Sequence, residues 1–288
     1  MGTAPEYTLI DTVDALSALI PSFCGLPSSP PSLYLDLEGQ DLGKDGTVAL
    51  IQIYVLPLKH TYLIDVHVLG NAAFTTTSTA PVSTPSLKAI LESPSIPKCL
   101  FDLRADSNAL FFLYGVSMQG VHDIQLMELA RRPGHYVNGL AKCIESDAGL
   151  SWRAKEAFKK TKEEGAKLFM PSKGGSWAIL CERPIKTQVM EYCVHDVKHL
   201  PTLWQLYKTT NNPSQRLIES ATLDRIALSK DPKFDRKGRN MALGPWGGPQ
   251  EEYWDCIESE QDDYSYLSDE ARDDFEDYNY DHDYYDVY

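Results

Sequence analysis

The stretch SLYLDLEG, residues 32–39, reads as an apolar strand that carries two acids. Because side chains alternate along a strand, Asp36 and Glu38 share one sheet face. Leu35 and Leu37 then point to the opposite face. Two like charges on an apolar strand are costly unless a cation lies between them, and carboxylate oxygens suit Mg²⁺ or Mn²⁺. The alternative is an edge strand whose acids are solvated.

A second acidic position, Asp196, lies on a helix near the C-terminal end of the predicted core. Apolar residues recur at helical spacing over 189–207, and Tyr192 and Asp196 stack on one side of that helix because they are four residues apart. A carboxylate beside an apolar stripe needs a cation, backbone N–H groups or a nearby Arg or Lys as its partner. Pro201 removes a helical hydrogen bond and predicts a kink just after Asp196.

A third acidic position, Asp106, follows a short apolar strand and lies early in a helix. Asp102 and Asp123 each stand at a strand–helix junction, where Asp commonly caps the first turn of the helix. We therefore expect capping roles for Asp102 and Asp123, and a site role for Asp106.

Together these positions resemble the three exonuclease motifs of the DEDD superfamily. Asp36-x-Glu38, Asp106, and Tyr192-x-x-x-Asp196 match the DEDDy branch, which includes ribonuclease D and Werner-type exonuclease domains. The DEDDh branch has a His five residues before the last Asp, where this chain has Glu191. The flanking text FDLRADSNALFFLYGV and HDIQLMELA is most similar to Egalitarian-like stand-alone members. The resemblance covers about Ser32 to Tyr207 and implies a ribonuclease H-like fold.

The resemblance also implies a chemistry and a role for each site residue. Two divalent cations, Mg²⁺ or Mn²⁺, support phosphodiester hydrolysis by a two-metal displacement. Asp36 is the ligand shared by both metals, Glu38 and Asp196 hold the metal that activates water, and Asp106 supports the other metal. Tyr192 orients the attacking water. The implied activity is a 3′–5′ exonuclease that releases nucleoside 5′-monophosphates from a single-stranded 3′ end of RNA or DNA.

Two other classes of function stay open at this point. One is a weak or inactive nuclease-fold protein that serves as an RNA-binding adaptor. The other is a structural interaction protein in which the acids only form ion pairs. Basic residues that could track phosphates form two groups, each of which could equally be a solvated surface: Arg153, Lys155, Lys159, Lys160, Lys162, Lys167 and Lys173, and then Lys233, Arg236, Lys237 and Arg239. Trp177 could stack on a base or pack in the core.

Composition points to an intracellular protein, in the cytoplasm or the nucleus. No apolar run reaches the length of a membrane span, so we expect no membrane partner. The first ten residues, MGTAPEYTLI, lack the charged and hydrophobic regions of a signal peptide. The six cysteines show no paired metal-ligand spacing and most lie in apolar surroundings, which indicates reduced thiols and no zinc site.

The net charge of −14 is unevenly distributed along the chain. Residues 249–288 hold 16 Asp or Glu against one Arg, whereas the first 248 residues hold 25 acids against 26 Lys or Arg. The acidic segment also holds eight of the sixteen tyrosines and has no sustained apolar period, so we expect disorder there. The alternative is an interaction tail that binds a protein partner or competes with nucleic acid for the basic surface.

The predicted organisation is an exonuclease domain over 1–248 followed by the disordered tail over 249–288. Within the domain we expect a core of about 32–207 and a helical extension over 208–248. Three leading strands followed by β/α alternation indicate an α/β fold with a mixed central sheet flanked by helices. The expected elements are a helix over 7–22, strands near 32–38, 47–56 and 60–66, a surface loop over 70–86, helix 86–93, strand 97–102, helix 104–115, strand 119–123, and helices over 124–131, 137–148, 152–164, 186–208 and 213–229.

Overall fold

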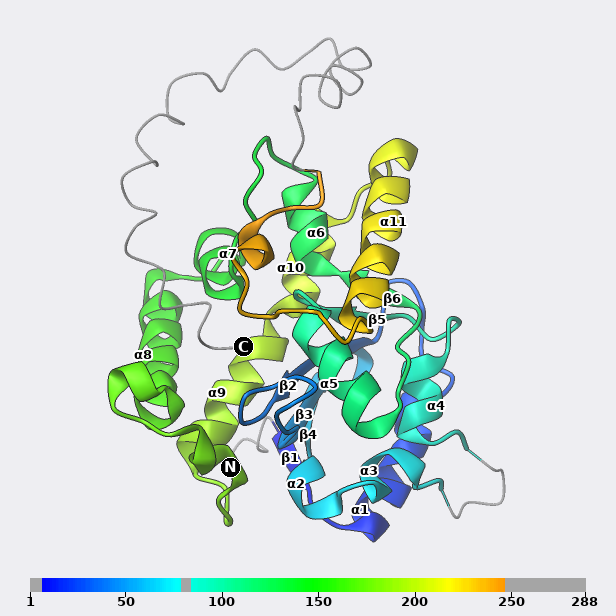
Figure 1. Ribbon diagram of the computed structural model, residues 1–288, viewed down its shortest axis with the longest axis vertical. Coiled ribbons are helices and arrows are strands. Elements are labelled where there is room, and N and C mark those ends of the chain that lie inside the picture. Colours follow the sequence, from blue (N-terminus) through cyan, green and yellow to red (C-terminus); the bar gives the residue numbers. More distant parts are fainter. Residues whose placement is uncertain (1–6, 79–83, 247–288) are drawn as a thin grey trace.

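A six-stranded sheet forms the centre of the computed structural model, which describes residues 7–78 and 84–246 (Figure 1). The predicted acidic tail lies outside these residues. The strand order is β1-β4-β3-β2-β5-β6. The strands are β1 (Tyr7–Ile10), β2 (Leu33–Glu38), β3 (Leu50–Val55), β4 (His60–Asp65), β5 (Lys98–Leu100) and β6 (Val121–Asp123).

The sheet is mixed, as predicted. β3 runs antiparallel to both of its neighbours, β2 and β4, whereas the pairs β1–β4, β2–β5 and β5–β6 are parallel. The register sets Asp36 opposite Gln52 and Glu38 opposite Leu50. Since β2 has a partner on each side, its two acids lie in the middle of the sheet and the edge-strand alternative is wrong.

Helices cover both faces of the sheet (Figure 1). They are α1 (Val13–Leu19), α2 (Val66–Leu69), α3 (Ala72–Thr75), α4 (Leu87–Glu92), α5 (Arg104–Tyr114), α6 (Ile124–Leu129), α7 (Leu140–Asp147), α8 (Trp152–Phe169), α9 (Thr187–Lys198), α10 (Leu200–Tyr207) and α11 (Asn212–Ser229). Short 3₁₀ turns lie at Ile20–Phe23, Leu56–Leu58, Pro171–Lys173, Trp177–Cys181 and Arg239–Ala242. Among the described residues, no helix combines the length and apolar character needed to cross a membrane.

Side chains of β2 alternate between two apolar cores. Leu35 and Leu37 belong to the core that α1, α4 and α5 cover. Tyr34 points to the opposite face and belongs to the core shared with α6, α7 and α10. Asp36 and Glu38 follow Tyr34 at intervals of two, so they lie on that second face, away from Leu35 and Leu37 as predicted.

Residues 7–22 contain a strand before the helix, so the prediction of a single helix there is wrong in its first part. Tyr7–Ile10 pairs in parallel with β4, and its alternating sequence of Tyr, Thr, Leu and Ile fits a strand. Thr12 then caps α1 by accepting a hydrogen bond from the Ala15 N–H at 3.2 Å. The pairing partner of β1 is some 50 residues away in sequence, so helical periodicity in 12–20 dominates the local pattern.

Two further expectations need correction. The predicted loop over 70–86 contains the short helix α3, whose Phe74 is buried against the first core; residues 79–83 lie outside the description. The predicted helix over 186–208 is two helices, α9 and α10, separated at His199. Pro201 stands in the first turn of α10, where its missing N–H costs nothing, so the predicted interruption after Asp196 is confirmed.

The two junction aspartates differ in role. Asp123 caps α6 as predicted, because its carboxylate accepts from the N–H groups of Gln125 and Leu126 at 3.1 and 3.4 Å. Asp102 lies two residues before the start of α5, outside the capping position, and instead forms an ion pair with Arg104, 2.6 Å from Nε. Its contact to the Arg104 N–H is long, at 3.4 Å.

Helix α11 is joined to this region by a buried ion-pair network. Arg225 lies 2.7 Å from Asp123 Oδ2 and 3.5 Å from Asp102 Oδ1, and its side chain is 5 % exposed. Burial raises the pKa of Asp102, but Arg104 and Arg225 outweigh it and lower that pKa to about 2. The helical extension is thus packed on the sheet at the point where α5, the helix of Asp106, begins.

We predict that Arg225→Met lowers the free energy of unfolding by about 3–5 kcal/mol at pH 7, because it leaves the buried Asp123 without its cation and removes one of the two cations beside Asp102. The stabilisation from Asp102 is present above the unfolded pKa of about 4 and is lost as pH falls toward 2. The difference in unfolding free energy between the unaltered protein and Arg225→Met therefore becomes smaller between about pH 4 and pH 2. Urea unfolding at pH 7, 4 and 3 measures this. Arg216→Met, on the exposed side of α11, is the matched control; an equal loss in both variants would contradict the network's role.

Candidate active site

Three of the predicted acids converge in one buried cluster. Helix α9 packs across β2, β3 and β4, and this brings Asp196 over the strand that carries Asp36 and Glu38. Ligand oxygens of the three carboxylates all lie within 4.8 Å of one another. The three residues are 3–6 % exposed, so their charges have little water to screen them.

Asp106 lies outside this close cluster but interacts electrostatically with two of its members, Asp36 and Glu38. It stands in the first turn of α5 and is 3 % exposed. Its Oδ1 has no hydrogen-bond partner among the described residues, which is rare for a buried carboxylate. Burial, followed by the charges of Asp36, Asp102 and Glu38, raises the pKa of Asp106 well above its usual range. An orphaned buried oxygen beside three other acids is a position that a cation would satisfy.

The electrostatics of the cluster also fit a cation. Burial, followed by the charge of Asp196, raises the pKa of Asp36 to about 8. Burial and the neighbouring acids raise the pKa of Glu38, and burial raises the pKa of Asp196. All four acids are therefore destabilised as carboxylates in the protein alone. Hard oxygen ligands on rigid elements suit Mg²⁺ or Mn²⁺.

Lys162, on α8, belongs to this site, although the sequence placed it only in a group of possible phosphate contacts. Its Nζ lies 2.5 Å from Asp196 Oδ1, and its side chain is 13 % exposed. The same ammonium lies 3.5 Å from the centroid of the Tyr192 ring. A signal for it exists in the sequence: Lys162 takes a place in the apolar stripe of α8, four residues after the buried Phe158 and seven before the buried Phe169.

Tyr192 is fixed between α8 and α9. The ring of Phe169 meets it edge-on, with centroids 4.7 Å apart. Gly165 lets the two helices approach, because a Cβ at that position would lie 2.4 Å from Tyr192 Cδ2. Tyr192 is 4 % exposed, so its ring has a single packed position one turn before Asp196. The spacing of Tyr192 and Asp196 on one side of α9 is as predicted.

Four of the other basic residues in the two groups pair with acids outside the cluster. On α8, Lys159 pairs with Glu145 and Lys160 pairs with Glu164 at its surface. In the second group, Arg236 and Lys237 both pair with Asp41, in the loop that follows β2. Trp177 packs on Phe169, with ring centroids 5.3 Å apart, which favours its core-packing alternative.

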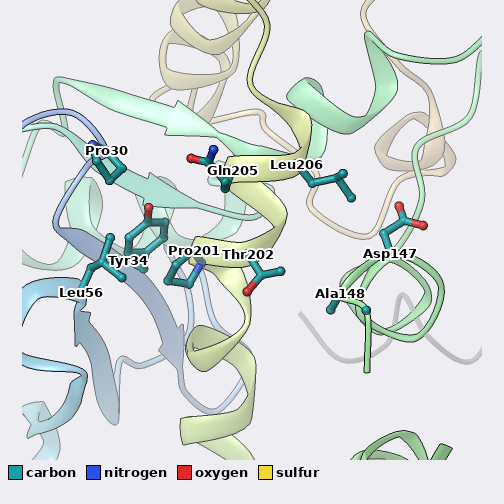
Figure 2. A pocket seen from close by; sticks show the side chains of 10 residues that line it. Pro30, Tyr34, Leu56, Asp147, Ala148, Pro201, Thr202, Gln205 and Leu206 are labelled. Carbon is teal, nitrogen blue, oxygen red and sulfur yellow. The ribbon is translucent and has the colours of Figure 1, made fainter. Parts of the chain in front are cut away.

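A pocket of about 580 Å³ lies near the opposite end of β2 from Glu38, between that strand, α10 and the end of α7 (Figure 2). Its walls include Tyr34, Leu56, Pro201, Gln205 and Leu206 and none of the four acids. Tyr34 shares the sheet face of Asp36, and its hydroxyl has no hydrogen-bond partner in the described part of the chain. The pocket is therefore a neighbour of the acidic cluster and separate from it.

Residues 7–208 match the family model described as 3′–5′ exonuclease. That match covers more than half of the chain, and the protein belongs to this family. The expected membership of the 3′–5′ exonucleases is thereby confirmed. No curated protein matches the sequence.

Solved structures of Trypanosoma brucei ribonuclease D have the same fold. The complex with RNA U12 is 23 % identical, with a TM-score of 0.60 over 79 % of this chain and 71 % of that one. The GMP complex is 24 % identical, with a TM-score of 0.61 over 79 % and 65 % of the two chains. The catalytic core of RRP6 from the same organism is 20 % identical, with a TM-score of 0.54 over 85 % and 59 %. The expected ribonuclease H-like fold is confirmed.

We predict that, in EDTA, the free energy of unfolding falls as pH rises from about 4 to 8. Asp36 loses its proton near pH 4 in the unfolded chain, whereas it retains the proton up to about pH 8 in the folded protein. Between these pH values the folded state binds one more proton, so a lower pH stabilises it. The slope is about 1 kcal/mol per pH unit while one such carboxyl titrates. Urea unfolding at pH 5, 6, 7 and 8 measures it.

Two controls accompany the pH series. Asp36→Asn reduces the slope by the share of one carboxyl, because the neutral amide does not titrate, while Glu38 and Asp106 still contribute. Excess Mg²⁺ also reduces the slope in the unaltered protein, because bound carboxylates are held as ligands. Equal stability at pH 5 and pH 8 in EDTA would contradict the raised pKa of Asp36.

Proposed function

We propose that the protein is a metal-dependent DEDDy-type 3′–5′ exonuclease, in the group that includes ribonuclease D and the Egalitarian-like stand-alone members. Its reaction is hydrolysis of phosphodiester bonds from the 3′ end of a nucleic acid, with release of nucleoside 5′-monophosphates. The observation that carries this proposal is the convergence of Asp36, Glu38 and Asp196 within 4.8 Å, together with an unpartnered buried oxygen on Asp106, which interacts electrostatically with Asp36 and Glu38. Membership of the 3′–5′ exonuclease family supports it.

The four acids would hold two divalent cations, Mg²⁺ or Mn²⁺. When bound, such a pair activates water and neutralises the leaving oxygen in an in-line displacement. Asp36 would serve both cations, as the family resemblance implies. Glu38 and Asp196, on β2 and α9, would hold the cation that activates water, and Asp106, on α5, would support the other. Four carboxylates neutralise the cations while leaving positions for water and phosphate.

Tyr192 is the residue that we assign to orienting the attacking water. A phenol has an ordinary pKa near 10 and is a poor base at neutral pH, so we assign positioning rather than proton abstraction. Support comes from its packing, since Gly165 and Phe169 give the ring one location next to Asp196. Holding water within reach of the phosphorus removes much of the entropic part of the barrier.

The proposed substrate is the single-stranded 3′ end of RNA or DNA. Trypanosoma brucei ribonuclease D has been solved with RNA U12 and with GMP, and we carry nucleic acid and nucleoside monophosphate over to this chain as substrate and product. We also propose an intracellular place of action, which the free thiols of the five described cysteines support. The acidic segment 249–288 remains a proposed site for a protein partner.

We further propose that residues 1–248 act as one catalytic unit, with 249–288 as an appended tail. Support comes from both ends of the described chain. The strand β1 joins the sheet beside β4, and Arg225 of α11 pairs with the aspartates that flank the start of α5. A catalytic core cut at residue 207 would lack that arginine.

We predict metal-dependent shortening of single-stranded RNA or DNA from the 3′ end, which Asp36→Asn or Asp196→Asn reduces by at least about 100-fold. We expect this size because mutating residues that only hydrogen-bond to a metal ligand already lowers metal affinity or activity by about 10–100-fold. The assay uses 3′- and 5′-labelled strands with Mg²⁺, Mn²⁺ or EDTA. Wild-type activity in a folded Asp36→Asn preparation would sink the assignment. Retained binding without cleavage by the unaltered protein, with either metal, would instead establish the inactive RNA-binding adaptor.

We predict that Gly165→Ala lowers kcat by about 10- to 100-fold, because its Cβ forces the Tyr192 ring away from its place and small misplacements are costly in catalysis. Ala stabilises a helix interior by about 1 kcal/mol relative to Gly, so helix loss would not explain the effect. Single-turnover rates and Mn²⁺ affinity should be measured together. Tyr192→Phe should lower kcat in the same way, and an unchanged rate in both variants would remove Tyr192 from the mechanism.

A further inference from the structure

The ammonium of Lys162 lies among the carboxylates that we assign to the metals. Its Nζ is 2.5 Å from Asp196 Oδ1. Its charge also offsets part of the rise in the pKa values of Asp36 and Glu38. The lysine therefore acts on three acids that belong to two different elements. In the protein alone, it supplies part of the positive charge that the cluster requires.

Helix α8 is built to deliver this side chain. Phe158, Ala166 and Phe169 on the same side of the helix are buried, so the face that carries Lys162 is fixed against the rest of the protein. Gly165, one turn further on, allows α8 to lie close to α9 at Tyr192. The stem of Lys162 then crosses the Tyr192 ring with the ammonium 3.5 Å from its centroid. Such a contact stabilises a cation that has been removed from water.

An ammonium and a divalent cation compete electrostatically for this carboxylate, because both are held by its negative charge. Mg²⁺ binds carboxylate oxygens at about 2.0–2.1 Å in a near-octahedral shell, and it tolerates little distortion. The ammonium has three donors and no acceptor, so it cannot become one of the metal's ligands. Two positive charges at the same buried oxygen repel each other strongly, since little water screens them. Binding of one therefore weakens binding of the other, and the separation of the two charges is favoured.

Lysine is suited to such an exchange because its charge is compact and its four-carbon stem is flexible. Neighbouring positions on α8, such as Lys160 and Glu163, are exposed, so solvent lies within reach of the helix surface. A rotation of the stem carries the ammonium toward water while the helix remains in place.

We propose that Lys162 is a built-in competitor of the divalent cation, which pairs with Asp196 in the metal-free protein and leaves that carboxylate when the metal binds. This inference rests on the proposed metal-dependent function. Lys162 thereby determines the metal concentration at which the site fills, because only the fraction of molecules with the lysine displaced is competent to bind. The measured affinity is the intrinsic affinity reduced by that fraction.

The test compares Mn²⁺ binding to full-length unaltered protein and Lys162→Met, by titration calorimetry and by the electron paramagnetic resonance signal of free Mn²⁺. We expect Lys162→Met to bind Mn²⁺ about tenfold more tightly, because no competing state remains. Lys160→Met, on the exposed side of the same helix, is the matched control and should leave the affinity unchanged. A merely structural role for Lys162 would not tighten binding.

Equal or weaker Mn²⁺ affinity in Lys162→Met would overturn the proposal. If that variant does not fold, the comparison of Lys162→Gln with Lys162→Arg decides, and Gln must bind Mn²⁺ more tightly than Arg. Mn²⁺ binding to the unaltered protein and to Asp196→Asn distinguishes the proposed metal site from the proposed competition by Lys162. Loss of Mn²⁺ binding in Asp196→Asn shows that the metal site is present, so failure of Lys162→Met then concerns Lys162 alone. Absence of binding to the unaltered protein would overturn the proposed metal-dependent function as well.

Discussion

Mutual repulsion of buried carboxylates is the constraint around which this protein is arranged. Asp36, Glu38 and Asp196 meet in the interior, Asp106 interacts electrostatically with the first two, and burial raises the pKa of each of the four acids. A fold tolerates such a cluster only where the surrounding elements hold their positions against it. The central strand β2 and the helix α9, each packed on apolar cores, provide that rigidity. The instability of the acids without a cation and their fitness to bind one have the same origin.

The supporting charges form two separate sets. In the first set, Lys162 of α8 pairs with Asp196. In the second set, Arg104 and Arg225 pair with Asp102 and Asp123, which precede α5 and α6, whereas Asp106 has an oxygen without a hydrogen-bond partner among the described residues. The second set is rigid and buried, whereas the first is a single flexible side chain. The buried arginines therefore pair with Asp102 and Asp123, which support the fold, and the flexible Lys162 pairs with Asp196, which would bind the metal.

Local patterns predicted the parts of this protein that depend on short-range periodicity. The alternation in SLYLDLEG placed Asp36 and Glu38 on one face, and the four-residue spacing placed Tyr192 beside Asp196. Pro201 correctly marked the break after that acid. Long-range partners could not be read in this way: β1 depends on pairing with β4, and the role of Lys162 depends on α8 lying against α9. Spacing within a segment shows which face a residue takes, but not which element will cover that face.

The ion pairs of Arg225 with Asp102 and Asp123 join distant parts of the sequence, and this affects when they can form during synthesis. Chains emerge from the ribosome N-terminus first, and contacts distant in sequence must wait for both partners. The strands that carry Asp36 and Asp123 are synthesised well before the arginine that neutralises Asp102 and Asp123, 102 residues after the latter. A nascent chain that has not yet released α11 lacks the cation that pairs with Asp123, whereas Asp102 already has Arg104. Completion of this buried ion-pair network, and with it the packing of α11 on α5 and β6, is thereby tied to near-completion of the domain.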